Sequence, residues 1–174
     1  MSKIQITGID PTKWSTYIEL DGYVPISFRS YEFALGGVRD ARILNDGGSF
    51  LELKMGLNST TLRGFTLLSF EKIHEPQTMN NLVEISGLPI LAIDETRFEG
   101  RESTQYLDLP GTFSVGFGKD FVEIDLGMLS TATRVAVCGP ARFFIDAFSL
   151  VGIQVSGLSE EEVAGIRVMV VSEG

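Results

Sequence analysis

Short runs of apolar residues, separated by glycine, asparagine, aspartate and proline, dominate this chain. In two runs apolar and other residues alternate: Leu51, Leu53 and Met55 form one series, and Val122, Ile124 and Leu126 form the other. A period of two places one set of side chains on the buried face of a β-strand and the other set on its outer face. Turn residues recur about every eight to twelve positions, which is typical of a fold built from many short strands.

Further strands are predicted where β-branched and aromatic residues cluster between these turns. They span residues 17–20, 24–28, 41–44, 64–70, 82–85, 90–93, 106–109, 112–117, 134–138, 143–148 and 166–171. Helix is scarce. Ser159 and Glu162 form a capping box that predicts a short helix ending at Gly165, and residues 75–84 are a second helical candidate. This content predicts an all-β fold, an antiparallel, jelly-roll-like β-sandwich with at most one or two short helices.

One strand–turn–strand phrase occurs twice. "FLELKMGLNSTTLR" (50–63) and "FVEIDLGMLSTATR" (121–134) align without a gap and are identical at six of fourteen positions. A second internal sequence similarity links residues 83–100 to residues 135–152. We interpret both as an internal pseudo-duplication with units of about 41–100 and 112–152, the first carrying an insertion around residues 70–83. The alternative is that hairpin-rich proteins reuse similar phrases by composition alone.

Length and composition indicate one domain. The chain has 174 residues, of which 44% are hydrophobic and 21% charged, enough to bury a substantial core. We expect a single β-sandwich over residues 17–174, preceded by an N-terminal arm or edge strand over residues 1–16.

Charge and hydropathy exclude several partners. The net charge of −9, with scattered lysines and arginines, opposes binding to nucleic acid and to anionic membranes. No apolar run approaches the roughly 18 residues of a membrane span, and the first residues lack a signal-peptide pattern. We therefore expect a protein made and folded in the cytoplasm.

The residue types used in catalysis are sparse. His74 is the only histidine and stands beside Pro76, which predicts an exposed loop residue without a catalytic partner. Cys138 is the only cysteine and is expected to be a small buried apolar group. Glu52, Glu123 and Asp125 are expected to be solvated acids on an outer sheet face. These residue types and the absence of known catalytic motifs predict no enzyme, no cofactor and no metal-binding cysteine cluster.

Two groups of residues are candidates for a binding role. Asp94 and Asp146 each end an apolar run, where an aspartate caps the following turn or ligates calcium. Trp14, Tyr17 and Tyr23 lie close together in sequence near the N-terminus. Such a cluster is suited to anchoring a neighbouring subunit or to stacking on sugar rings.

Some phrases resemble known families. "GGSFLELKMG", "TLRGFTLL" and "RFFIDAFSL" resemble strands of jelly-roll carbohydrate-binding modules, although this chain has few aromatic residues for sugar stacking. "STYIELDGY" is similar to the opening strand of tail-tube and secretion-tube proteins, without the Gly-Glu-Ser that commonly follows there. The resemblances imply a β-sandwich that binds glycans or takes part in an assembly such as a phage virion.

The functional expectation that follows is a non-catalytic structural subunit. It would self-assemble into a trimer or ring, as a phage virion component for capsid decoration or cement, or as a tail protein. A carbohydrate-binding module is the alternative.

Overall fold

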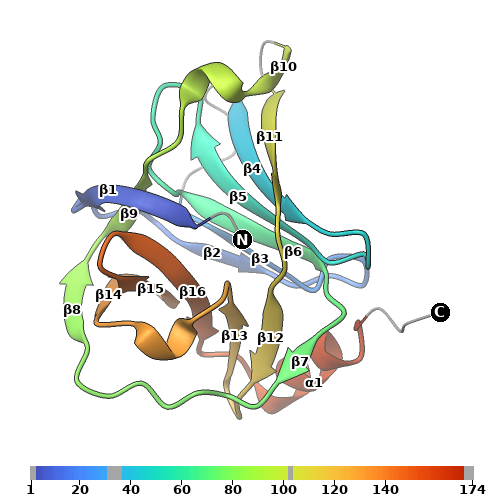
Figure 1. Cartoon of the computed structure of the whole chain (residues 1–174). Coiled ribbons are helices and arrows are strands. Elements are labelled where there is room, and N and C mark those ends of the chain that lie inside the picture. The colour runs from blue at the N-terminus through green and yellow to red at the C-terminus, as the bar shows by residue number, and fades with distance from the viewer. Residues whose placement is uncertain (1–2, 31–36, 102–103, 171–174) are drawn as a thin grey trace.

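Two β-sheets packed face to face form the protein, so the prediction of an all-β sandwich is confirmed (Figure 1). The computed structural model describes residues 3–30, 37–101 and 104–170. The first sheet runs in the order β7 (Ile73–His74), β12 (Ser114–Phe117), β13 (Phe121–Asp125), β16 (Ser149–Ser156), β15 (Ala141–Asp146), β14 (Arg134–Cys138), β8 (Val83–Ser86). The second runs β10 (Glu99–Arg101), β11 (Thr104–Pro110), β4 (Val38–Leu44), β5 (Phe50–Gly56), β6 (Gly64–Ser69), β3 (Ile26–Arg29), β2 (Tyr17–Glu19).

Both sheets are mixed rather than purely antiparallel. The pairs β11–β4, β12–β7 and β14–β8 run parallel, and the other pairs in the two strand orders are antiparallel. Three consecutive strands in each sheet, β4–β6 and β14–β16, pair as a meander. A parallel pair requires a long connection, and each of these three pairs joins strands far apart in the chain.

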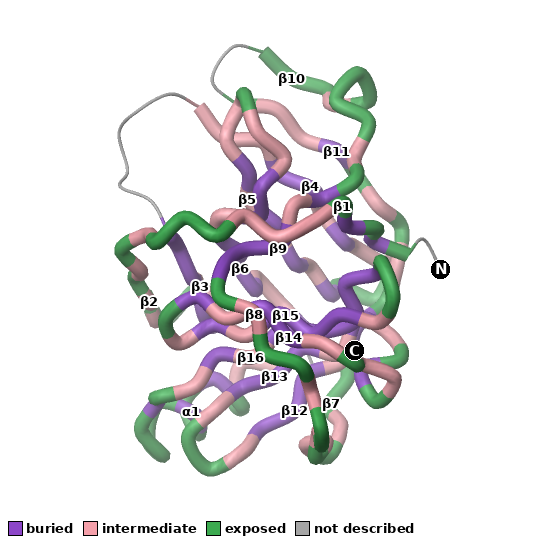
Figure 2. Tube along the Cα trace, turned by 90° about the vertical axis from the view of Figure 1, so that its left-hand side faces the viewer, coloured by how far each residue is buried: buried purple, intermediate pink, exposed green. Residues whose placement is uncertain are grey.

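Apolar side chains from both sheets form one core. The Phe28 and Phe143 rings meet edge to face across the sandwich with centroids 6.1 Å apart, and Phe70 lies 5.9 Å from Phe117. Leu51 and Leu53 are fully buried, as their alternation predicts. The buried segments gather in the interior of Figure 2, whereas β8 and β10 are exposed. The larger apolar cluster therefore draws on strands of both sheets.

The N-terminal segment belongs to this core. Strand β1 (Ile4–Asp10) pairs first with the start of β16 and then with β9 (Leu88–Leu91), and a bulge between Ile6 and Gly8 interrupts the pairing with β9. Ile4 and Ile6 are buried. Residues 1–16 were expected to form an arm or an edge strand. Ile4 to Asp10, which the structure describes, form a strand.

The repeated phrase does not form equivalent units. In its first copy, β5 and β6 pair directly as a hairpin, with Lys54 opposite Gly64. In its second copy, β13 and β14 are separated in the sheet by β16 and β15. The pseudo-duplication therefore does not extend to strand pairing.

Residues 75–82, which we call the strap, contain no helix and correct the helical prediction for residues 75–84. The strap joins β7 to β8, the two opposite edges of the first sheet, and runs along the bottom of Figure 1. Crossing six inter-strand gaps requires about 29 Å, and nine residue steps reach about 30 Å only when extended. A helix, rising about 1.5 Å per residue, cannot span that distance.

Met79 and Leu82 of the strap pack against a second, smaller apolar cluster on the outer face of the first sheet. Its buried members are Leu129, Val135, Phe144 and Val151. The strap therefore covers part of the sheet face that the alternation pattern would leave to solvent.

The C-terminal prediction is partly wrong. Helix α1 (Glu160–Arg167) begins with the predicted capping box, in which the Ser159 hydroxyl accepts from the Glu162 N–H, but it continues through Gly165. Ile166 and Arg167 are therefore helical, not part of a strand over residues 166–171, of which residue 171 lies outside the described residues. Elsewhere in the part of the chain that the structure describes, the helices are the short 3₁₀ turns Glu95–Arg97 and Leu129–Thr131. Within the described ranges, none of these helices has the length and apolar character to span a bilayer.

Candidate functional site

A chain of hydrogen bonds on the outer face of the first sheet joins three residues that lie far apart in sequence. The Ser114 hydroxyl lies 2.9 Å from His74 Nδ1, and His74 Nε2 lies 2.9 Å from Glu123 Oε1. Because Nε2 faces a carboxylate, it carries the ring proton, and Nδ1 accepts the proton of the Ser114 hydroxyl. The prediction that His74 is an exposed loop residue without a partner is therefore wrong.

Glu123 is buried, with 1% of its surface exposed, so the prediction of a solvated acid is wrong for this residue. Its Oε1 atom accepts the backbone N–H of Gln77 at 2.8 Å as well as the His74 ring N–H. The Gln77 side chain also donates to Asp125 at 3.1 Å. The buried carboxylate thus fastens the strap to β13, which explains why it tolerates burial.

Gly116 provides the space for the His74–Glu123 pair. It lies opposite Glu123 in β13 and beside His74 in β7. A Cβ atom at this position would lie 2.7 Å from His74 Nε2 and 2.9 Å from Glu123 Oε1. The hydrogen-bonded pair therefore requires a residue without a side chain in β12.

The direction of these hydrogen bonds is that of a serine–histidine–acid triad, but the backbone around Ser114 does not suit acyl transfer. Such enzymes use the N–H after the nucleophile as an oxyanion donor. Here the Val115 N–H donates to the Lys72 carbonyl at 2.9 Å as part of the sheet. We therefore interpret the network as structural.

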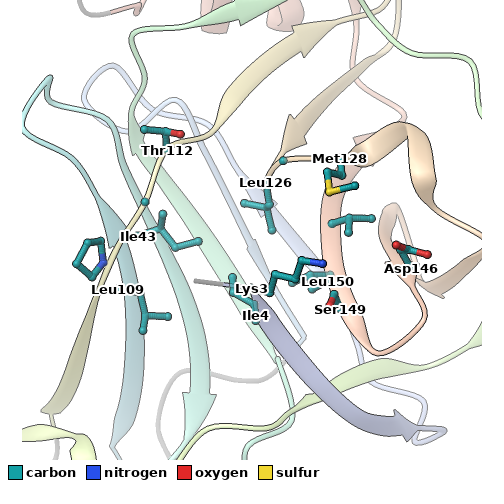
Figure 3. A pocket seen from close by; sticks show the side chains of 14 residues that line it. Lys3, Ile4, Ile43, Leu109, Thr112, Leu126, Met128, Asp146, Ser149 and Leu150 are labelled. Atoms are coloured by element: carbon teal, nitrogen blue, oxygen red, sulfur yellow. The ribbon is translucent and has the colours of Figure 1, made fainter. Parts of the chain in front are cut away.

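A pocket of about 210 Å³ opens between the ends of the two sheets (Figure 3). β4 and β11 contribute apolar side chains on one side, and the segment after β13 and the start of β16 contribute them on the other. The labelled apolar residues are Ile4, Ile43, Leu109, Leu126, Met128 and Leu150. Lys3, Asp146 and Ser149 supply polar groups in the same lining.

The two candidate aspartates have different surroundings. Asp94 caps the 3₁₀ turn that follows it, because its Oδ1 atom accepts from the Thr96 N–H at 3.0 Å and from the Thr96 hydroxyl at 2.7 Å. These bonds lower the pKa of Asp94. Asp146 ends β15 and lines the pocket. Among the described residues, no group of three or more acidic, histidine or cysteine side chains is placed to hold a metal ion.

The three N-terminal aromatic residues do not form one platform. Trp14 is half-buried against the core, and the Arg63 guanidinium covers one face of its indole at 3.8 Å from the ring centre. Tyr17 lies on the edge strand β2 and is 40% exposed. Tyr23, in the β2–β3 loop, is 94% exposed. Sugar stacking on Trp14 is thus limited to the ring face that Arg63 leaves open.

Sequence reasoning missed the contacts of His74 and Glu123, since they come from strands that only the sheet brings together. The available signal was Gly116, a glycine between the strand residues Val115 and Phe117, which indicates a close approach. No comparable feature of the sequence indicates the pocket. Neither the models of known protein families nor the curated proteins with which we compared the chain match it.

Proposed function

We propose that the protein is a non-catalytic structural subunit that assembles with copies of itself, in the manner of capsid-decorating and tail proteins of phage virions. The observation that carries the proposal is the presentation of Tyr23. Its side chain is 94% exposed on a turn closed by Asp21, whose Oδ1 atom accepts the N–H groups of Tyr23 and Val24, both at 2.7 Å. These two bonds lower the pKa of Asp21, which keeps the carboxylate ionised in the turn.

A large aromatic side chain held in water by a fixed turn is suited to insertion into a partner. Tyrosine is enriched among the residues that dominate interface energies, and a preformed turn reduces the entropy lost on binding. Tyr17 lies on β2 in the same hairpin, and among the described strands β2 stands at one edge of the second sheet. An open edge offers backbone hydrogen-bonding groups to a second copy.

We infer that the β2–β3 hairpin of one copy packs against the same hairpin of another. Such a contact is self-complementary and closes a dimer around a two-fold axis, and the trimer or ring expected from the sequence would need a second, heterologous contact. The acidic net charge of −9 supports a protein partner over nucleic acid.

The test is the absolute mass in solution, measured by light scattering behind a sizing column. We expect the wild-type chain to exceed its monomer mass of 19.0 kDa. Replacing Tyr17 and Tyr23 with serine should release monomers, because both apolar contacts are lost. The matched control is Phe148→Ser, which removes another exposed aromatic ring, 68% accessible, on the β15–β16 turn. A wild-type protein that remains monomeric at every concentration would contradict the proposal and favour the carbohydrate-binding alternative.

Truncation of the N-terminus is not a suitable test. Removing residues 1–16 would delete β1 together with the buried side chains of Ile4 and Ile6. Loss of assembly would then reflect a damaged core. Point substitutions in the hairpin leave the core intact and separate the two effects.

A further inference from the structure

The pocket between the sheet ends is enclosed enough to hold a small ligand. Ile43 and Leu126 keep 6% of their surface accessible, whereas Leu51 and Leu53 in the centre of the core keep none. The core therefore does not close at this end of the sandwich. A dry apolar cavity of about 150 Å³ binds benzene, and drug-sized ligands need about 300 Å³ or more. A volume of about 210 Å³ suits one ring or one branched chain.

Two opposite charges stand in the lining of this apolar pocket. Among the described residues, the Lys3 ammonium has no carboxylate within 4.0 Å, and the Asp146 carboxylate has no ion-pair or hydrogen-bond partner. Figure 3 shows the Lys3 side chain extending across the pocket toward the side on which Asp146 lies. The Ser149 hydroxyl, by contrast, is already bonded to the Gln5 amide at 2.9 Å.

We propose that this pocket binds a small apolar amino acid in its zwitterionic form. The side chain would fill the apolar volume, the α-carboxylate would pair with Lys3, and the α-ammonium would pair with Asp146. A ligand carrying one charge satisfies one of the two protein groups and is repelled by the other. A sugar would leave most of its hydroxyl groups against hydrocarbon, which is costly. This binding does not depend on the self-assembly proposed above.

The affinity should be low, because the pocket accommodates about a dozen non-hydrogen atoms and its charged groups are open to solvent. At about 0.3 kcal/mol per atom, a dissociation constant on the order of 1 mM is expected. The test is an NMR titration of the isotope-labelled protein with L-phenylalanine, 3-phenylpropionate, phenethylamine and toluene. Changes in the backbone amide chemical shifts of Leu126, Gly127 and Met128 report binding at the pocket itself.

L-phenylalanine should bind severalfold more tightly than either singly charged analogue. Lys3→Gln and Asp146→Asn should each weaken its binding about two- to fivefold, as expected for solvent-exposed pairs, and leave toluene binding unchanged. Leu109→Trp, at a half-buried lining position, should block all four compounds. Equal binding of the four compounds, no shift of these amides, or unchanged phenylalanine affinity in both charge variants would each overturn the proposal. The two charge variants alter only polar groups in the pocket lining, so they decide the question even if Leu109→Trp does not fold.

Discussion

Replacing Glu123 with alanine tests whether the buried carboxylate holds the strap on the sheet. The substitution removes the acceptor of two N–H groups, those of His74 Nε2 and the Gln77 backbone. One buried donor left without an acceptor costs about 1–3 kcal/mol. His74 and Gln77 are only partly buried, so water compensates in part. We therefore expect the free energy of unfolding to fall by about 2–4 kcal/mol.

The matched control is Glu52, which occupies the position of Glu123 in the first copy of the repeated phrase. Glu52 is half-buried and pairs with Lys54 at 2.8 Å, and Lys54 also contacts Asp40 at 3.3 Å. Glu52→Ala therefore leaves Lys54 with a partner, and its expected cost is about 0–1 kcal/mol. Glu123→Gln keeps one oxygen acceptor and should fall between the two alanine variants.

The assay is equilibrium unfolding in urea at one protein concentration, because assembly would shift the apparent stability. With a slope of about 2 kcal/mol per molar urea, Glu123→Ala should lower the midpoint by about 1–2 M. The slope itself should not change. Equal midpoints for Glu123→Ala and Glu52→Ala would refute the structural role of the network.

Three further predictions concern packing, ionisation and thiol reactivity. Gly116→Ala should cost about 1–3 kcal/mol in the same assay, because the added methyl group overlaps the His74 ring; wild-type stability would contradict the close approach. Burial raises the pKa of Asp40 above its ordinary value of 3.8, so the stability it contributes is greatest below pH 3.8 and declines as the pH rises through the raised pKa. Lys54→Met should raise the pKa of Asp40 further, because the Lys54 ammonium lowers it in the wild type. NMR of the Asp40 carboxyl group measures the pKa in the wild type and in the variant. A wild-type pKa at or below 3.8 would be inconsistent with burial. Burial also raises the pKa of the Cys138 thiol, so a thiol reagent at neutral pH should label the unfolded chain and spare the native one, and rapid native labelling would show that this strand end opens.

Local patterns predicted the elements that bury one face. The alternation in β5 and the capping box at Ser159 each depend on residues a few positions apart, and both are present as expected. The central strand β16 was not predicted, because nearly all of its residues are buried and it shows no alternation. A strand near β1 was predicted only as one of two alternatives for residues 1–16, because its partners in β9 and β16 lie far along the chain.

The sequence by itself determined that this protein is an acidic, all-β sandwich with one short capped helix, because strand periodicity, turn residues and capping are local properties. It could not distinguish Glu52 from Glu123, which occupy the same position in the repeated phrase. Only the tertiary structure decided that the strap crosses β13 and buries one of them beside His74. The pocket was likewise decided by the tertiary structure, which brings together residues from five separate segments. Burial and cavities arise from contacts between distant parts of the chain, and a local sequence pattern does not predict which distant residues will meet.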